Sequence, residues 1–155
     1  MPEKRTIELA RRDKRQGKSA STQAGEFVRQ EIHHIREGKH GARSTKQAIA
    51  IGLSEARRAG IALPPPKNAS PAVRKQAARD SAKAHAHTPV SPKRSRAAKR
   101  ALEHEGHSAA SPAALSRHAR SAAAHHTKAE RSGAARAAAR TRKRTSTRRG
   151  RGGAS

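Results

Sequence analysis

The side chains of this chain that could do chemistry are cations, which occur in clusters along almost its whole length. There are 36 lysine and arginine residues against 11 aspartate and glutamate residues, and the formal net charge is +25 over 155 residues. Ammonium and guanidinium groups bind phosphate oxygens, and a chain this basic repels itself unless a polyanion neutralises it. The composition therefore favours nucleic acid as a partner.

The cations that we expect to contact nucleic acid lie in a run near the N-terminus and in residues 93–151. The N-terminal run suits either a solvated helix face or a phosphate-contacting arm, and the larger excess of charge further along favours the arm. The chain closes in an Arg-Gly-Gly segment, which is typical of flexible phosphate-binding termini. The expected contacts are Arg11, Arg12, Lys14, Arg15, Lys18, Lys93, Arg94, Arg96, Lys99, Arg100, Arg117, Arg120, Arg136, Arg140, Arg142, Lys143, Arg144, Arg148, Arg149 and Arg151.

Histidine is the other residue type with candidate chemistry, and ten are present. Adjacent histidines on a helix point in different directions and do not easily face one ion, and the i, i+3 pair is interrupted by Gly106. Because cysteine is absent and carboxylates are scarce, we predict no metal site and no cofactor, and the histidines then only add positive charge below pH ~6.5. The pairs considered are His33–His34, His85–His87, His104–His107 and His125–His126.

Catalysis and base-specific recognition both lack the residues that they need. No serine or histidine lies in a recognisable nucleophile turn, and the glycine-rich stretch 150–153 precedes no helix, so we predict that the protein is not an enzyme. A single phenylalanine, without tyrosine or tryptophan, cannot make a base-stacking platform, and no zinc-finger spacing occurs. We therefore expect contacts to phosphates without sequence preference, with base recognition by the N-terminal helices as the lesser alternative.

Most of the bulky apolar residues lie in the first 63 positions. After them only Val73, Val90, Leu102 and Leu115 remain, while residues 61–155 carry 22 basic and 4 acidic groups against 14 and 7 in residues 1–60. Alanine buries little area at about 25 cal/mol per Å², so it offsets little of the ~1–2 kcal/mol per residue that ordering costs. The early apolar residues are Ile7, Leu9, Phe27, Val28, Ile32, Ile35, Ile49, Ile51, Leu53, Ile61 and Leu63.

Three helices are predicted in the first 60 residues, at 2–15, 22–37 and 45–59. An apolar stripe at i, i+4, i+8 and i+11 supports the second helix, with Ser21 or Thr22 as its cap, and Ser44 with Gln47 forms a capping box before the third. The alternation of Ile49, Ile51 and Leu53 is also typical of a strand, but the capping box and the residues that follow favour helix. The predicted hairpin buries little area, so it needs the first helix, a partner or self-association for stability.

One stretch of these helices resembles a known family. The stretch from Gly25-Glu26-Phe27-Val28 to Lys46-Gln47-Ala48-Ile49-Ala50-Ile51-Gly52-Leu53-Ser54-Glu55-Ala56 resembles short, basic, uncharacterised bacterial proteins with the signature Lys-Gln-Ala-Ile-Ala-Ile-(Ala/Gly)-Leu-Ser-Glu-Ala. The resemblance covers roughly residues 20–60. It implies no established activity and no catalytic residues, although members of the family are sometimes labelled DNA-binding or plasmid-stabilisation proteins.

A degenerate repeat follows the three consecutive prolines at 64–66, which favour a short polyproline spacer over residues 61–69. Ser-Pro occurs at 70–71, 91–92 and 111–112, and Ser132-Gly133 falls at the next expected position, so the period is about 21 residues. Each Ser-Pro suits an N-cap followed by proline at the first helical position, and Thr127 is a further break or cap. Without an apolar stripe, such helices are marginal in water.

The sequence thus predicts a mainly α protein in three parts: a small helical head at 1–60, best defined over 21–60, a Pro-rich linker at 61–69, and a largely disordered, nascent-helical basic tail at 70–155. The composition of the tail is similar to that of linker-histone tails, and the expected function is non-specific, nucleoid-associated DNA binding and condensation in the cytoplasm. The alternatives are an RNA- or ribosome-associated protein and a plasmid-stabilisation or stress-related accessory protein. No membrane span is predicted.

Overall fold

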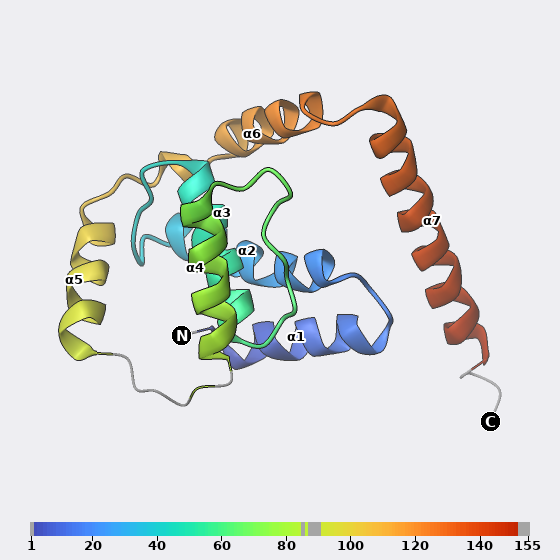
Figure 1. Ribbon diagram of the computed structural model, residues 1–155, viewed down its shortest axis with the longest axis horizontal. Helices are drawn as coiled ribbons and strands as arrows, with labels where there is room; N and C mark the ends of the chain where they lie inside the picture. Colours follow the sequence, from blue (N-terminus) through green and yellow to red (C-terminus); the bar gives the residue numbers. More distant parts are fainter. Residues whose placement is uncertain (1, 85, 87–90, 152–155) are drawn as a thin grey trace.

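The computed structural model describes residues 2–84, 86 and 91–151, with the side chains of 145–151 left out of the description. Over these residues the protein is all α, as Figure 1 shows. The elements are α1 (Lys4–Arg15), α2 (Ala20–Arg36), α3 (Thr45–Arg58), α4 (Pro71–Lys83), α5 (Pro92–Glu103), the 3-10 helix η1 (Ser108–Ala110), α6 (Pro112–Ala124) and α7 (Lys128–Arg151).

The helices expected in the first 60 residues are present, and their caps explain where two of them begin. The Ser44 hydroxyl accepts a hydrogen bond from the Gln47 amide at 3.2 Å, and the Gln47 side chain accepts one from the Arg43 amide at 2.8 Å. This capping box resolves the Ile49–Leu53 alternation in favour of helix. α2 begins earlier than expected, because Ser19 rather than Ser21 or Thr22 is its cap.

α2 and α3 cross closely enough that one face of α3 must carry small residues. Ala48, Gly52 and Ala56 are buried along this face at i, i+4 and i+8. A Cβ atom on Gly52 would lie 2.7 Å from the Cα of Val28, so the two backbones are in direct contact there. The bulkier Ile49 and Leu53 are only partly buried beside this line.

α1 belongs to the core, although its sequence offers few apolar residues. Ala10 packs with Ala24, Phe27 and Ala56 in one buried cluster, and Ile7 lies against that cluster. Asp13 is 1% exposed, and its carboxylate accepts a hydrogen bond from the Lys18 ammonium at 2.6 Å. The ion pair compensates the buried charge and fixes the turn between α1 and α2.

The expectation of a small hairpin followed by a disordered tail is wrong, because helices cover most of residues 70–151 and two segments of that region dock on the head. α4 is the first such segment, and it packs against α3. Ala77 is buried in this contact, and Asp80 is fully buried. The Asp80 carboxylate accepts hydrogen bonds from the Ser54 hydroxyl at 2.8 Å and from the Arg58 guanidinium at 2.9 Å.

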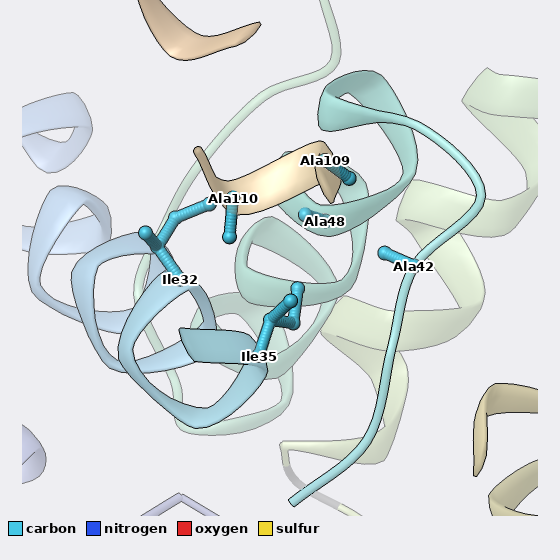
Figure 2. Packing of buried hydrophobic residues seen from close by; sticks show 6 residues of the cluster. All are labelled: Ile32, Ile35, Ala42, Ala48, Ala109 and Ala110. Atoms are coloured by element: carbon cyan, nitrogen blue, oxygen red, sulfur yellow. The ribbon is translucent and has the colours of Figure 1, made fainter. Parts of the chain in front are cut away.

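The second segment is η1 with the start of α6, which completes the core between α2 and α3. Ala109 and Ala110 pack with Ile32, Ile35, Ala42 and Ala48, as Figure 2 shows, and Leu115 lies against this cluster. The Thr45 hydroxyl donates to the Ala109 carbonyl at 2.7 Å, and the Arg36 guanidinium donates to the Ala110 carbonyl at 2.8 Å. The burial that the hairpin lacks is therefore supplied by distant segments of the same chain.

Alanine-rich segments of residues 70–151 can pack on the head because the small size of alanine stabilises the contact in addition to the area that it buries. Small side chains let backbones approach within hydrogen-bonding distance, and polar side chains of the head then satisfy the carbonyl groups of η1. In α4 the buried polar group is the Asp80 carboxylate, which accepts hydrogen bonds from the side chains of Ser54, Arg58 and Gln76. An estimate from bulky apolar residues alone overlooks both effects.

The end of α5 is attached to the loop between α2 and α3 by backbone hydrogen bonds. The Gly41 amide donates to the Leu102 carbonyl at 2.8 Å, and the Ala42 amide donates to the Gly106 carbonyl at 3.0 Å. A Cβ atom on Gly41 would overlap the Glu105 carbonyl, so this approach requires glycine. The rest of α5 and all of α7 lie outside the packed body, on opposite sides of it in Figure 1.

The Ser-Pro repeat correctly predicts where three helices begin. α4, α5 and α6 each start at the proline of a Ser-Pro pair, and the hydroxyls of Ser70 and Ser111 accept the capping hydrogen bonds. At the fourth repeat position Ser132-Gly133 begins no helix and lies inside α7. α7 begins instead after Thr127, whose hydroxyl accepts from the Glu130 amide at 3.2 Å while the Glu130 carboxylate accepts from the Thr127 amide at 2.7 Å.

Asp80 gives a testable pH dependence. Burial raises the pKa of its carboxyl, but hydrogen bonds from Ser54, Arg58 and Gln76 and the charge of Arg58 outweigh this, so the pKa is lowered overall. Such a group stabilises the fold above its unfolded pKa of about 3.9, and the stabilisation is lost as the pH falls through the lower folded pKa. Asp80→Asn should lower the free energy of unfolding at pH 7 by about 1–3 kcal/mol.

The measurement is urea denaturation of wild type and Asp80→Asn between pH 7 and pH 2. We expect the gap between the two proteins to shrink as the pH falls below about 4, with α4 losing amide protection first in the variant. Ser81→Asn, one residue further on at an exposed position, is the control and should leave stability within about 0.5 kcal/mol. A gap that stays constant down to pH 2 would contradict the role given to the carboxylate.

Candidate nucleic-acid interface

The N-terminal cations form the outer face of α1. The buried face of this helix carries Thr6, Ala10 and Asp13, whereas the cations at 11, 12, 14 and 15 are exposed. Lys18 differs from these, because its ammonium group is paired with Asp13 and shapes the turn. Of the expected contacts in this run, Arg11, Arg12, Lys14 and Arg15 therefore face solvent and Lys18 supports the fold.

α1 carries two further cations that the sequence analysis did not single out. Lys4 and Arg5 are exposed and lie seven residues before Arg11 and Arg12, so all four share the outer face of the helix. The seven-residue spacing in the sequence indicates a shared helix face only once residues 4–15 are known to be helical. Glu8 lies on the same exposed side and reduces the charge of the face by one.

α5 presents five exposed cations over 12 residues. Lys93, Arg96 and Arg100 fall at i, i+3 and i+7, so they share one face of the helix. Lys99 lies next to this face, and its ammonium group is 3.7 Å from the Glu103 carboxylate. Arg94 lies on the other side of the helix. α5 can thus place several cations along one phosphate backbone.

α6 carries the two cations expected from the sequence. Arg117 and Arg120 are exposed, and the Arg120 guanidinium makes hydrogen bonds with the carbonyl and the hydroxyl of Ser116 on its own helix. These bonds leave the guanidinium at the protein surface, where phosphate oxygens can compete for it. α6 connects the packed body to α7, as Figure 1 shows.

α7 is the longest helix and the richest in cations. At a rise of 1.5 Å per residue, its 24 residues extend about 36 Å. Arg136, Arg140, Arg142, Lys143 and Arg144 project around the helix rather than along one stripe. The remaining expected contacts, Arg148, Arg149 and Arg151, belong to the same helix but their side chains lie outside the described part of the structure.

Glu130, in the first turn of α7, is the only acidic residue of this helix. Hydrogen bonds from the backbone and side chain of Thr127 lower the pKa of Glu130, which keeps it ionised at the positive end of the helix dipole. Beyond Glu130 the sequence contains no carboxylate side chain. The charge of α7 is therefore positive from its second turn to its end.

The structure separates the expected contacts into two groups. The Arg144 guanidinium donates to the Gly17 carbonyl at 3.2 Å, which brings α7 back to the turn between α1 and α2. The carboxyl end of α1 therefore lies near α7, whereas the helix α5 lies on the opposite side of the body (Figure 1). Several other arginines serve the fold, because Arg36, Arg57 and Arg58 donate to Ala110, Leu63 and Asp80.

Carboxylates and histidines gather at the carboxyl end of α2 and the loop that follows it. Hydrogen bonding to His34 lowers the pKa of Glu3, and hydrogen bonding to Lys39 lowers that of Glu37. The Glu37 contact in turn raises the pKa of Lys39. Glu31, His34 and His40, which the sequence analysis did not group, also meet here.

Residues 11–67 match a protein family of unknown function, DUF6496. The match spans the last five residues of α1, all of α2 and α3 and the proline segment, and it includes the stretch at 20–60 on which the sequence resemblance rests. No curated protein matches this chain, and no solved structure does. Among the described residues, no helix has both the length and the apolar character needed to cross a membrane.

Proposed function

We propose that the protein binds DNA through its phosphates without sequence preference and condenses it, as a nucleoid-associated, linker-histone-like protein. The observation that carries the proposal is the charge of residues 81–155, which hold 18 basic and 3 acidic residues. Those cations whose surroundings are described lie on exposed helix surfaces outside the packed core. Such a distribution supports binding driven by the release of counterions from the duplex.

The helices refine how binding would occur. A disordered tail must be ordered on the duplex at a cost in conformational entropy, whereas α5 and α7 already hold their cations at fixed spacing. α7 carries cations on several sides, and α5 lies on the opposite side of the body. A molecule with two separated cationic surfaces can contact two duplexes at once, and this supports condensation in addition to simple coating.

The test is the salt dependence of binding to a random-sequence DNA duplex, measured by fluorescence anisotropy. With about 6–10 phosphate contacts, affinity should fall by ~10³–10⁵ between 50 and 200 mM salt. The variant Arg136→Gln, Arg140→Gln and Arg142→Gln should reduce the slope of log K against log salt by about 2–3. Those three cations are exposed, so α7 should remain helical.

A matched control places glutamine on the same helix without removing charge. Ala135→Gln, Ala138→Gln and Ala139→Gln occupy exposed positions beside the three arginines and should leave the slope unchanged. A shallow slope for the wild type would refute phosphate binding as the function. Structured RNA that displaces duplex DNA at equal phosphate concentration would instead favour an RNA-associated role.

A further inference from the structure

Three metal-ligating side chains converge at the carboxyl end of α2. Glu31 and His34 lie one helical turn apart, and His40 comes from the loop that follows. One ligand atom from each of the three lies within 4.8 Å of the others. The spacing of the histidines in the sequence does not indicate this group, because His40 returns to α2 only through the turn at Gly38, whose φ is +74°.

The distance between His40 and Glu31 suits two ligands of an ion better than it suits a hydrogen bond. The Nε2 atom of His40 lies 3.6 Å from the Oε2 atom of Glu31, which is beyond a good N–H···O hydrogen bond. Two ligands at about 2.0–2.2 Å from a tetrahedral Zn²⁺ are separated by roughly 3.4 Å. The observed separation is therefore close to that of two ligands of one ion.

Glu31 is the residue whose position needs an explanation. It is 2% exposed, and its Oε1 atom is buried without a hydrogen-bond partner. Burial raises the pKa of this carboxyl, with His40 opposing the shift. A buried carboxylate with an unpartnered oxygen is expensive unless a cation compensates it.

The surroundings orient the two imidazoles. The Nδ1 atom of His40 lies 3.1 Å from the Gly41 carbonyl, and a hydrogen bond donated from Nδ1 leaves the lone pair of Nε2 on the side of Glu31. The Nε2 atom of His34 lies 2.9 Å from the Glu3 carboxylate. Hydrogen bonds from Gly41 and Ala42 to the end of α5 fix the loop that carries His40.

We propose that Glu31, His34 and His40 form a binding site for a divalent transition-metal ion of the zinc class. Two imidazoles and one carboxylate are a ligand set that Zn²⁺ accepts, with the fourth position left to water. The ion would join α2 to the loop at 38–44 and, through that loop, to the end of α5. The three ligands lie in the packed body and include none of the cations expected to contact phosphates.

The experiment titrates the full-length protein with Zn²⁺ by calorimetry and with Co²⁺ by its visible absorption, after removal of bound metal with a chelator. We expect one equivalent of either ion to bind, with a Co²⁺ spectrum of tetrahedral type and a rise in Tm on adding Zn²⁺. Glu31→Gln and His40→Ala should each weaken Zn²⁺ binding by at least the roughly 10- to 100-fold that loss of a supporting residue causes.

His33→Ala is the matched control. His33 is adjacent to His34 but exposed, and its ring contacts Glu37 at 3.0 Å instead of the cluster. The His33→Ala variant should bind Zn²⁺ with the same affinity as the wild type. Glu31→Gln removes the buried charge without changing shape, so we expect it to fold without metal and to show no Zn²⁺-dependent rise in Tm.

Two results would overturn the assignment. One is a wild-type protein that shows neither saturable Zn²⁺ binding nor the Co²⁺ spectrum. The other is wild-type affinity in both Glu31→Gln and His40→Ala, which would place the bound ion on other histidines of the chain. Both readouts are independent of DNA binding, so a failure of the metal site leaves the proposed function untouched, and the reverse also holds.

Discussion

Ala110→Asp is expected to lower the free energy of unfolding by about 3–5 kcal/mol, because it places an unpaired carboxylate in the core. Ala110 is 0% exposed, and Figure 2 shows its methyl group directed between Ile32 and Ile35. Small domains are stable by about 5–15 kcal/mol, so the variant should lose much of its cooperative unfolding transition. Urea denaturation followed by circular dichroism measures the effect.

Ala113→Asp is the control for this substitution. Ala113 is exposed in the first turn of α6, where a carboxylate interacts favourably with the helix dipole, so stability should stay within about 1 kcal/mol of wild type. If Ala110→Asp were as stable as Ala113→Asp, residues 108–110 would not be part of the core. The head would then be an independent unit, as its apolar pattern alone suggests.

The same pair of variants separates folding from phosphate binding. Each changes the net charge by one, so the cations on α5 and α7 are retained in both. If separate cationic helices are sufficient for binding, affinity for a DNA duplex should fall less than about tenfold in either variant. Loss of binding in Ala110→Asp alone would mean that the packed body arranges the contacts.

Local signals in the sequence predicted local structure well. Ser44 with Gln47 predicts the start of α3, and the Ser-Pro pairs predict the starts of α4, α5 and α6, because capping depends on residues a few positions apart. Thr127, the further break or cap, begins α7 in the same way with Glu130, five residues before the Ser132-Gly133 position of the repeat. These signals say where helices begin and leave open what they pack against.

Long-range packing was not predictable from the apolar pattern. The segment at 108–115 offers only Leu115 as a bulky residue, and its docking depends on Thr45 and Arg36, more than 60 residues away in the sequence. Asp80 is a single acidic residue in a basic stretch, and only the fold brings it to Ser54 and Arg58. Hydrogen bonds between distant polar groups leave no periodic trace in a sequence.

The candidate sites divide in the same way. Exposed cations on α1, α5 and α7 follow from composition and helical spacing, because charged residues without a buried partner lie at the surface. The metal-ligating group depends on a loop that turns back on α2, so the spacing of Glu31 and His34 gave only half of it. A Glu-x-x-His pair on a helix followed by a third histidine beyond a glycine is the pattern that would have indicated it.

The second large effect on stability is expected at the crossing of α2 and α3, and Gly52→Leu tests it. A Cβ atom at residue 52 would lie 2.7 Å from the Cα and 2.9 Å from the amide nitrogen of Val28, and backbone atoms cannot rotate away as a side chain can. The helices must separate, and overpacking of this kind costs about 1–3 kcal/mol, and occasionally more. We expect Gly52→Leu to lie at or above the upper end of that range, because the remaining leucine atoms extend the overlap.

Gly25→Leu is the matched variant, since both glycines lie inside a helix and both receive the same side chain. A Cβ atom on Gly25 meets nothing within 4 Å, so replacing glycine there should stabilise the protein by about 0.5–1 kcal/mol through helix propensity alone. The two variants should therefore change Tm in opposite directions in a thermal melt followed by circular dichroism. Equal shifts in Tm would mean that α2 and α3 are not in contact at residue 52. The packing of Ile32, Ile35 and η1 against these two helices would then differ from that described above.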